Sequence, residues 1–95
     1  MSYKSILVHV DESERCKARV DLAARLALDF DAHLTGLASA WVPPLPAPVR
    51  AEMGDEFFDR YRELRRTRAR DALSAFYANA HLAGVTRLET RLMYG

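Results

Sequence analysis

The sequence predicts an α/β fold of the three-layer type, with an open parallel sheet built in the order β-α-β-α-β. A short apolar run at 6–10 indicates a strand, and strand-like segments recur at 33–40 and 88–94. Amphipathic segments at 14–31 and 55–82 separate them and predict two helices. Because each connection contains a whole helix, neighbouring strands should be parallel and the crossovers right-handed. The expected strand order is 3-2-1.

The composition fits one small globular domain over residues 1–95. The chain has 49% hydrophobic and 28% charged residues, and no apolar run approaches the roughly 20 residues that span a membrane. No segment resembles a secretory signal and the single Cys16 cannot form an internal disulfide, so we expect a cytoplasmic protein with Cys16 buried. A net charge of +1 gives no reason to expect nucleic acid or an anionic membrane as partner.

The first strand is the most informative segment. Residues 6–10 are mostly apolar and largely β-branched, which predicts a strand buried on both faces. The strand ends at Asp11, and Ser13 is a good N-cap for the helix that follows. Ligands of open α/β sheets bind outside the carboxyl ends of the strands, so Asp11 is the candidate binding residue. The alternative is that Asp11 only helps to cap the helix.

Both predicted helices carry an apolar face with three- and four-residue spacing. In the helix at 14–31 this face consists of Cys16, Val20, Ala23, Ala24, Ala27 and Phe30. In the helix at 55–82 and just before it, the face consists of Met53, Phe57, Tyr61, Leu64, Ala72, Leu73, Phe76, Tyr77 and Ala80. A helix of ~28 residues is about 40 Å long, so we expect its first turns to overhang the sheet or to break off. Gly84 is the expected stop after it.

The second helix also carries a dense basic cluster. Its members are Arg60, Arg62, Arg65, Arg66, Arg68 and Arg70. These arginines lie around most of the helix circumference, with acidic residues between them and without interleaved stacking aromatics. We therefore expect a solvated, salt-bridged surface rather than a nucleic-acid site.

All four prolines lie at 43–48, between the second strand and the second helix. Proline cannot donate a backbone hydrogen bond and disfavours helix in the preceding residue, so we expect an extended loop over residues 41–49. The alternative interpretation is a proline-rich ligand for an aromatic-lined groove.

Known patterns of catalytic chemistry are missing from the sequence. His9, His33 and His81 have no metal-ligand spacing with each other or with Cys16. There is neither a Walker loop nor a Gly-x-Ser-x-Gly nucleophile motif. We therefore expect no enzymatic activity and no metal site.

Three segments together resemble the amino-terminal half of a universal stress protein domain. They are Ile-Leu-Val-His-Val-Asp-Glu-Ser at 6–13, Leu-Ala-Ala-Arg-Leu-Ala at 22–27 and Ala-His-Leu-Thr-Gly-Leu at 32–37. The resemblance implies an adenine nucleotide alpha hydrolase-like fold, with five parallel strands in the order 3-2-1-4-5 flanked by four helices. It identifies residues 1–95 as part of one such domain.

Many members of this family bind ATP, and the resemblance implies where the ligand would lie. Asp11 matches the aspartate that contacts adenine, with His9 and Val10 beside it in the strand. Leu37 or Ala38 matches the residue that contributes backbone contacts from the second strand. The glycine-rich motif that holds the phosphates comes late in the family pattern, and residues 1–95 do not contain it. We therefore expect no cofactor in this chain, weak adenine nucleotide binding at best, and ATP binding only in an intact domain.

Two functions follow as hypotheses. The first is a universal stress protein-like fragment in stress response, with a residual half of an adenine-nucleotide site. The second is a non-enzymatic oligomerising module without nucleotide. Right-handed crossovers would put both helices on one face of the sheet, leaving the other face and the edge of the first strand uncovered. This predicts a homodimer.

Overall fold

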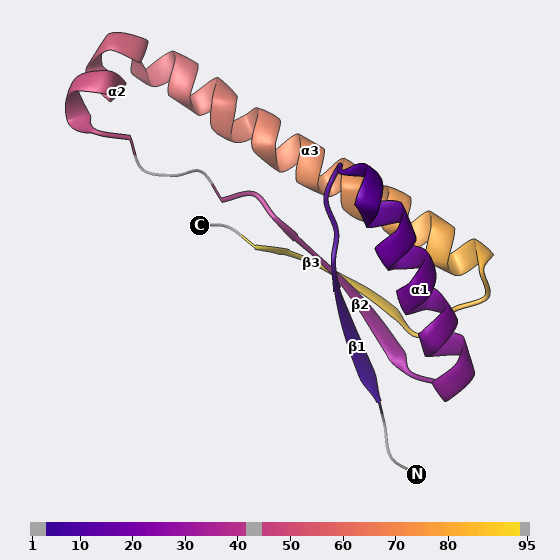
Figure 1. The fold of residues 1–95 in the computed structure, drawn as a ribbon. Helices are drawn as coiled ribbons and strands as arrows, with labels where there is room; N and C mark the ends of the chain where they lie inside the picture. Colours follow the sequence, from indigo (N-terminus) through magenta and orange to yellow (C-terminus); the bar gives the residue numbers. More distant parts are fainter. Residues whose placement is uncertain (1–3, 42–44, 94–95) are drawn as a thin grey trace.

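The computed structural model describes residues 4–41 and 45–93, which form three parallel strands and three helices (Figure 1). The elements are β1 (Ser5–His9), α1 (Glu14–Phe30), β2 (His33–Ser39), α2 (Ala47–Met53), α3 (Asp55–Leu82) and β3 (Leu88–Met93). The strands lie in the order β1-β2-β3, which is the predicted 3-2-1 read from the other edge. The α/β class and the parallel pairing are therefore confirmed.

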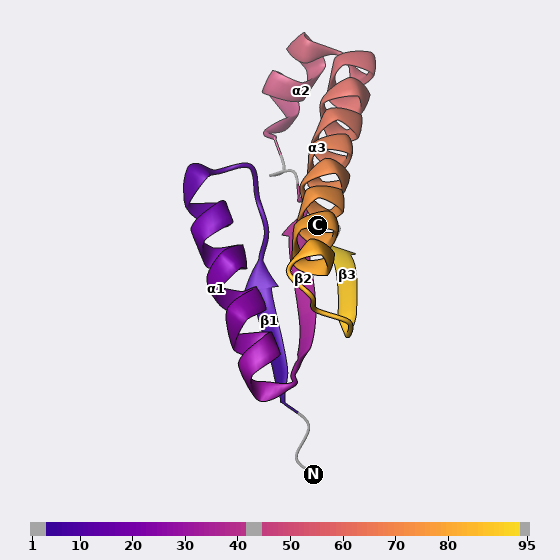
Figure 2. The same cartoon turned by 90° about the vertical axis from the view of Figure 1, so that its right-hand side faces the viewer.

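The register of the sheet assigns alternate residues to one face. Ile6 pairs with Leu34 and Val8 pairs with Gly36, so these residues point to the same side. This side is covered by α1 and α3, which both lie in front of the sheet in Figure 2. Both helices thus lie on one face of the sheet (Figure 2), as expected for two successive crossovers of the same hand.

The closest approach in the core is between β2 and α3. A Cβ atom added to Gly36 would lie 2.5 Å from Cε2 of Phe76, so only glycine leaves room for this ring. Leu34 and Ala38 flank the contact and are fully buried. The centre of β2 therefore fixes where the second half of α3 lies on the sheet.

Helix α1 follows the prediction except at its last residue. It begins after Ser13, the N-cap, and ends before Asp31, which has the left-handed φ of 50°. The buried residues agree with the expected face, but Phe30 is 53% exposed. The last turn of α1 lies level with residue 4, where the sheet begins, and the ring of Phe30 contacts Nζ of Lys4 at 4.1 Å instead.

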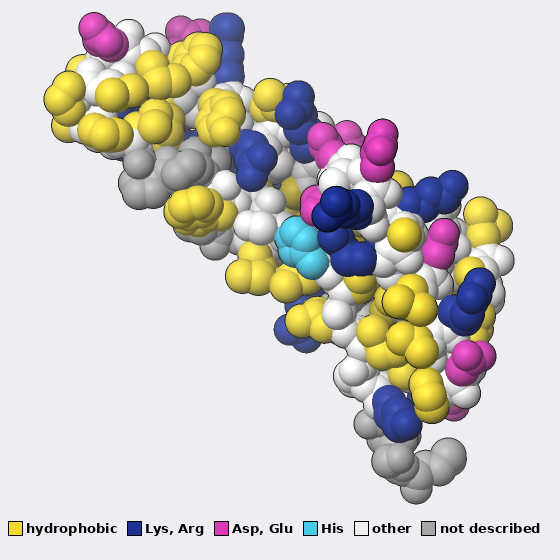
Figure 3. Space-filling model, viewed as in Figure 1, with side chains coloured by type: hydrophobic (Ala, Val, Ile, Leu, Met, Phe, Trp, Pro, Cys, Tyr) yellow, Lys and Arg dark blue, Asp and Glu magenta, His cyan; other side chains and the backbone are white. Residues whose placement is uncertain are grey.

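Helix α3 overhangs the sheet, as its length predicted (Figure 1). The radius of gyration is 16.5 Å, against about 12 Å for a compact chain of this length. The expected apolar face is wrong for the overhanging half, because no strand lies beneath it. Its exposed members are Met53, Phe57, Tyr61 and Leu64. Figure 3 shows hydrophobic side chains gathered at this end of the molecule, over α2 and the start of α3.

The buried residue in the overhanging half is Phe58, which the sequence pattern did not select. Its ring lies 4.6 Å from the guanidinium of Arg50 in α2 and 5.2 Å from that of Arg62 in α3. The contact joins α2 to α3 and covers Phe58 without any help from the sheet.

The expected loop over 41–49 is wrong in its second part, because α2 begins at Ala47. Pro46 is the N-cap and Pro48 lies in the first turn, where a missing N–H costs no hydrogen bond. Pro43 and Pro44 lie outside the described residues.

Burial of β1 on both faces is also wrong in this structure. Leu7 points away from the helices and is 66% exposed, because no described element covers that face of the sheet. In the part of the chain that the structure describes, no helix is both long and apolar enough to cross a membrane.

Candidate functional site

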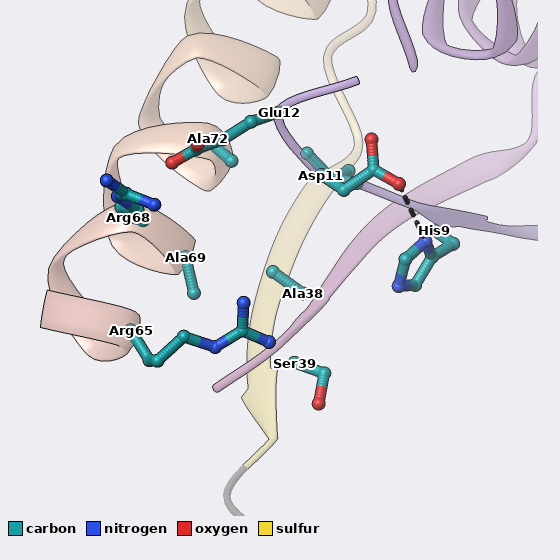
Figure 4. A pocket seen from close by; sticks show the side chains of 10 residues that line it. His9, Asp11, Glu12, Ala38, Ser39, Arg65, Arg68, Ala69 and Ala72 are labelled. Carbon is teal, nitrogen blue, oxygen red and sulfur yellow. Dashed lines mark ion pairs between the residues drawn. The ribbon is translucent and has the colours of Figure 1, made fainter. Parts of the chain in front are cut away.

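A cleft of about 220 Å³ opens at the carboxyl ends of β1 and β2, beside α3 (Figure 4). Its lining residues are His9, Val10, Asp11, Glu12, Ala38, Ser39, Arg65, Arg68, Ala69 and Ala72. Four of the five predicted binding residues therefore meet here, since His9, Val10, Asp11 and Ala38 all line the cleft. The sheet positions them, because β1 and β2 are parallel neighbours and deliver their last residues to one end.

Leu37, the fifth predicted residue, does not line the cleft. Its carbonyl oxygen accepts a hydrogen bond from the N–H of Val10 at 2.8 Å. This bond extends the β1–β2 pairing by one residue, so the carbonyl of Leu37 serves the sheet, and of the two residues expected to offer backbone contacts only Ala38 lines the cleft. The side chain of Leu37 belongs to the opposite face of the sheet, because it alternates with Gly36 and Ala38.

Asp11 is held by its own turn. Its Oδ1 accepts hydrogen bonds from the backbone N–H of Ser13 at 2.8 Å and from the Ser13 hydroxyl at 2.5 Å. Its Oδ2 accepts one from Nη2 of Arg19 at 3.1 Å, and Nδ1 of His9 lies 3.6 Å away. The Ser13 side chain thus binds Asp11 instead of capping a helix N–H. Asp11 braces the entry to α1, in the manner of an Asx turn.

These contacts also set the charge of the carboxyl group. The hydrogen bonds from Ser13 and then the guanidinium of Arg19 hold the pKa of Asp11 below its ordinary value. Asp11 is therefore an ionised acceptor at neutral pH. It remains partly exposed, with 38% of its side-chain surface accessible to solvent, so a donor from solution can reach it.

Sequence reasoning missed the opposite wall of the cleft, which belongs to α3. Arg65 and Arg68 line it, and Nη2 of Arg65 lies 3.5 Å from the carbonyl oxygen of Trp41. The spacing of residues along α3 could have revealed these two arginines. The small residues Ala69 and Ala72 mark the helix face that approaches the strands, and Arg65 and Arg68 precede them on that face.

The arginines of α3 fall into different environments. Arg60 pairs with Glu56 at 3.0 Å and Arg66 pairs with Glu63 at 3.8 Å, in agreement with the expected salt-bridged surface. Among the ion pairs between described residues, none includes Arg65 or Arg68. In the cleft, Asp11 is paired with Arg19, whereas Glu12, Arg65 and Arg68 have no ion pair among the described residues.

A second cavity of about 370 Å³ lies between α1 and α3 on the far side of the Asp11 turn. Its apolar surface comes from Val10, Cys16, Val20 and Phe76. Across residues 4–41 and 45–93, no group of three His, Cys, Asp or Glu residues could hold a metal ion.

No protein-family model matches the chain, and no curated protein sequence matches it. Solved structures do match. A universal stress protein family member from Burkholderia pseudomallei is 26% identical, with a TM-score of 0.70 over 98% of this chain. UspA from Lactobacillus plantarum is 24% identical, with a TM-score of 0.80 over the whole chain. The chain has the universal stress protein fold.

A universal stress protein in complex with cAMP has the same fold, with 23% identity and a TM-score of 0.66 over the whole chain. The chain spans about two thirds or less of these structures: 64%, 63% and 63% of their lengths, in the order given. The chain therefore represents part of the universal stress protein fold.

Proposed function

We propose that the chain is a universal stress protein-like fragment that acts in the cytoplasmic stress response without catalysis, and that its cleft is one half of an adenine-nucleotide site. The observation that carries the proposal is the meeting of Asp11, Val10 and Ala38 at the carboxyl ends of two adjacent parallel strands. The complex of one similar universal stress protein with cAMP supports an adenine nucleotide as the ligand class.

The chemistry of the cleft suits the base and the sugar. An ionised Asp11 accepts hydrogen bonds from the exocyclic amine of adenine or from ribose hydroxyls. Val10 and Ala38 line the cleft but are only 3% and 1% exposed, so a base would touch little of either side chain and would lie mainly beside Asp11. Oδ2 of Asp11 makes its hydrogen bond to an exposed guanidinium, that of Arg19, which a ligand can displace at small cost.

Titration of the protein with adenosine, followed in amide NMR spectra, tests this proposal. We expect resonances of Val10, Asp11 and Ala38 to shift, with a dissociation constant near ~1 mM, equivalent to about −4.1 kcal/mol. Asp11→Asn should abolish the shifts. Asp29→Asn, which changes an exposed acid of α1 away from the cleft, should leave them unchanged. Absence of shifts, or shifts that survive Asp11→Asn, would overturn the proposal.

A second candidate function is an oligomerising module, and one region of the sheet favours it. The uncovered face has a polar side on β3, where Glu89 lies 3.2 Å from Nε2 of His33 and 3.4 Å from Nε of Arg91. Its apolar side lies on β1, where Leu7 is exposed and the strand edge is unpaired among the described residues. A second copy would pair antiparallel with β1 across a two-fold axis, which would place the exposed Leu7 of both copies on one shared face of the extended sheet.

Light scattering of the dilute protein tests this homodimer. Leu7→Lys should convert the dimer to a monomer, because it places a charge at the centre of the proposed contact. Leu82→Lys is the matched control, since Leu82 is the exposed last residue of α3 and lies away from β1. A wild-type protein that is monomeric and folded at low micromolar concentration would contradict this function.

A further inference from the structure

Arg65 and Arg68 give the cleft an asymmetric distribution of charge. On the side of β1, Asp11 is compensated by Arg19 at 3.1 Å and has His9 at 3.6 Å. On the side of α3, neither cleft arginine has a carboxylate partner among the described residues. Both arginines are solvent-exposed and Glu12 lines the same cleft, so the two guanidiniums attract an anion through a modest excess of positive charge that salt screens.

Arg65 and Arg68 both line the cleft from α3. They are three residues apart, so they lie on one helix face about one turn apart. Figure 4 shows the Arg65 side chain extending from α3 toward Ala38 and Ser39, whereas Arg68 lies on the next turn with its guanidinium apart from that of Arg65. The weak hydrogen bond of Arg65 to the Trp41 carbonyl at 3.5 Å leaves its remaining N–H donors available.

We propose that the cleft selects a nucleoside monophosphate, whose phosphate binds Arg65 and Arg68 while its sugar and base lie toward Asp11. This inference rests on the proposed function and names its ligand class. One guanidinium can donate two parallel hydrogen bonds to two oxygens of a phosphate. Two guanidiniums together carry the charge that balances one phosphate dianion.

The acidic turn sets an upper limit on the phosphate chain. Glu12 lines the same cleft as Asp11, and Ser13 and Glu14 continue the turn without any glycine. Further phosphates would therefore meet carboxylates rather than a cradle of backbone N–H groups. Only the first phosphate of the ligand should therefore add affinity. AMP should bind more tightly than adenosine, and ATP should bind no more tightly than AMP.

The test compares the dissociation constants of adenosine, AMP and ATP by amide NMR titration at one ionic strength. We expect AMP to bind about tenfold more tightly than adenosine, through two exposed charge-assisted contacts. Arg65→Gln combined with Arg68→Gln should remove this advantage while adenosine affinity stays unchanged. The charge-matched control is Arg60→Gln combined with Arg66→Gln, whose native partners are Glu56 and Glu63 on the solvent side.

The outcomes separate this inference from the function on which it rests. If adenosine binds but AMP binds no more tightly, the monophosphate assignment is wrong and the half-site for adenine stands. The same conclusion follows if the advantage of AMP survives Arg65→Gln with Arg68→Gln, or is lost equally in the control. If ATP binds at least tenfold more tightly than AMP, the limit to one phosphate is wrong. If neither adenosine nor AMP shifts any resonance, both the proposed function and this inference fail.

Discussion

The two halves of α3 carry similar apolar patterns but have different surroundings. In the first half, Phe57 is 55% exposed, and Tyr61 and Leu64 are also exposed. In the second half, Phe76 is 3% exposed and Leu73 and Ala80 are also buried, although Tyr77, which was expected on the same face, is 47% exposed. The difference begins at Ala69, the next buried residue of α3 after Phe58, and the first half of the helix extends beyond the sheet (Figures 1 and 2).

The comparison shows what an amphipathic pattern means. Residues spaced by three and four mark a helix face that is able to bury itself, in both halves of α3. Whether the face is buried depends on what lies beneath it, and the sheet is shorter than the helix. The second half thus contributes to the stability of the fold, whereas the first half presents an apolar surface beside α2.

The largest expected effect comes from matched truncations in the two halves. Phe76→Ala should lower the free energy of unfolding by about 3–5 kcal/mol, because it empties the volume above Gly36. Phe57→Ala should change it by no more than about 0.5 kcal/mol, since the ring is mostly exposed. Urea denaturation measures both values. Equal losses would mean that the overhanging half is packed in solution.

Hydrogen exchange should show the same division along the backbone. We expect the amides of residues 70–80 to exchange at least about a hundredfold more slowly than those of residues 59–64, because an unsupported helical segment opens with little cost. Native-state exchange followed by NMR gives the protection factors. Uniform protection along α3 would contradict the comparison.

A smaller effect is expected from filling the closest contact of the packed half. Gly36→Ala should cost about 1–3 kcal/mol, because its Cβ would lie 2.5 Å from the Phe76 ring and force it to move. Adding Phe76→Leu should recover part of this loss in thermal melting, since it removes the ring atoms that collide. If the losses of stability caused by Gly36→Ala and by Phe76→Leu simply add in the double variant, the added Cβ does not collide with the Phe76 ring.

The smallest effect concerns the charged turn next to the packed half. The pKa of Asp11 is lowered from 3.8 in the folded protein, so its stabilising contribution is present above that pH. The contribution is lost as the pH falls through the lowered value. Asp11→Asn should therefore narrow the stability difference between neutral and acidic pH, as measured by melting temperature. Asp29→Asn should leave that difference nearly unchanged.

Much of the fold could be predicted because its signals are local. The apolar run before Asp11 and the spacing of Cys16, Val20 and Ala27 depend only on strand and helix periods. The failures have tertiary causes. Leu7 and Phe57 have the composition of buried residues, but no described element covers them. Pro48 lies inside a helix because the first turn tolerates proline, which a loop assignment over the whole proline-rich segment overlooked.

The residues of the candidate site also fall into those that local sequence patterns predict and those that depend on tertiary packing. His9, Val10, Asp11 and Ala38 were predictable because parallel neighbouring strands end together. Arg65 and Arg68 lie about 30 residues beyond Ala38 in the sequence, on a helix whose position depends on the contact of Phe76 with Gly36. Spacing along the helix indicates which face they share, but that face becomes part of the cleft only through tertiary packing.

The buried thiol of Cys16 gives the protein a reporter of its own motion. Cys16 is 7% exposed beneath α1, with the N–H of Asp11 directed at its sulfur at 3.4 Å. Because the thiol is only 7% exposed, at the wall of the cavity between α1 and α3, its labelling by a thiol-reactive dye should speed up whenever the contact between the two helices opens. Because the sequence has a single cysteine, the kinetics report this one opening event without any engineered label.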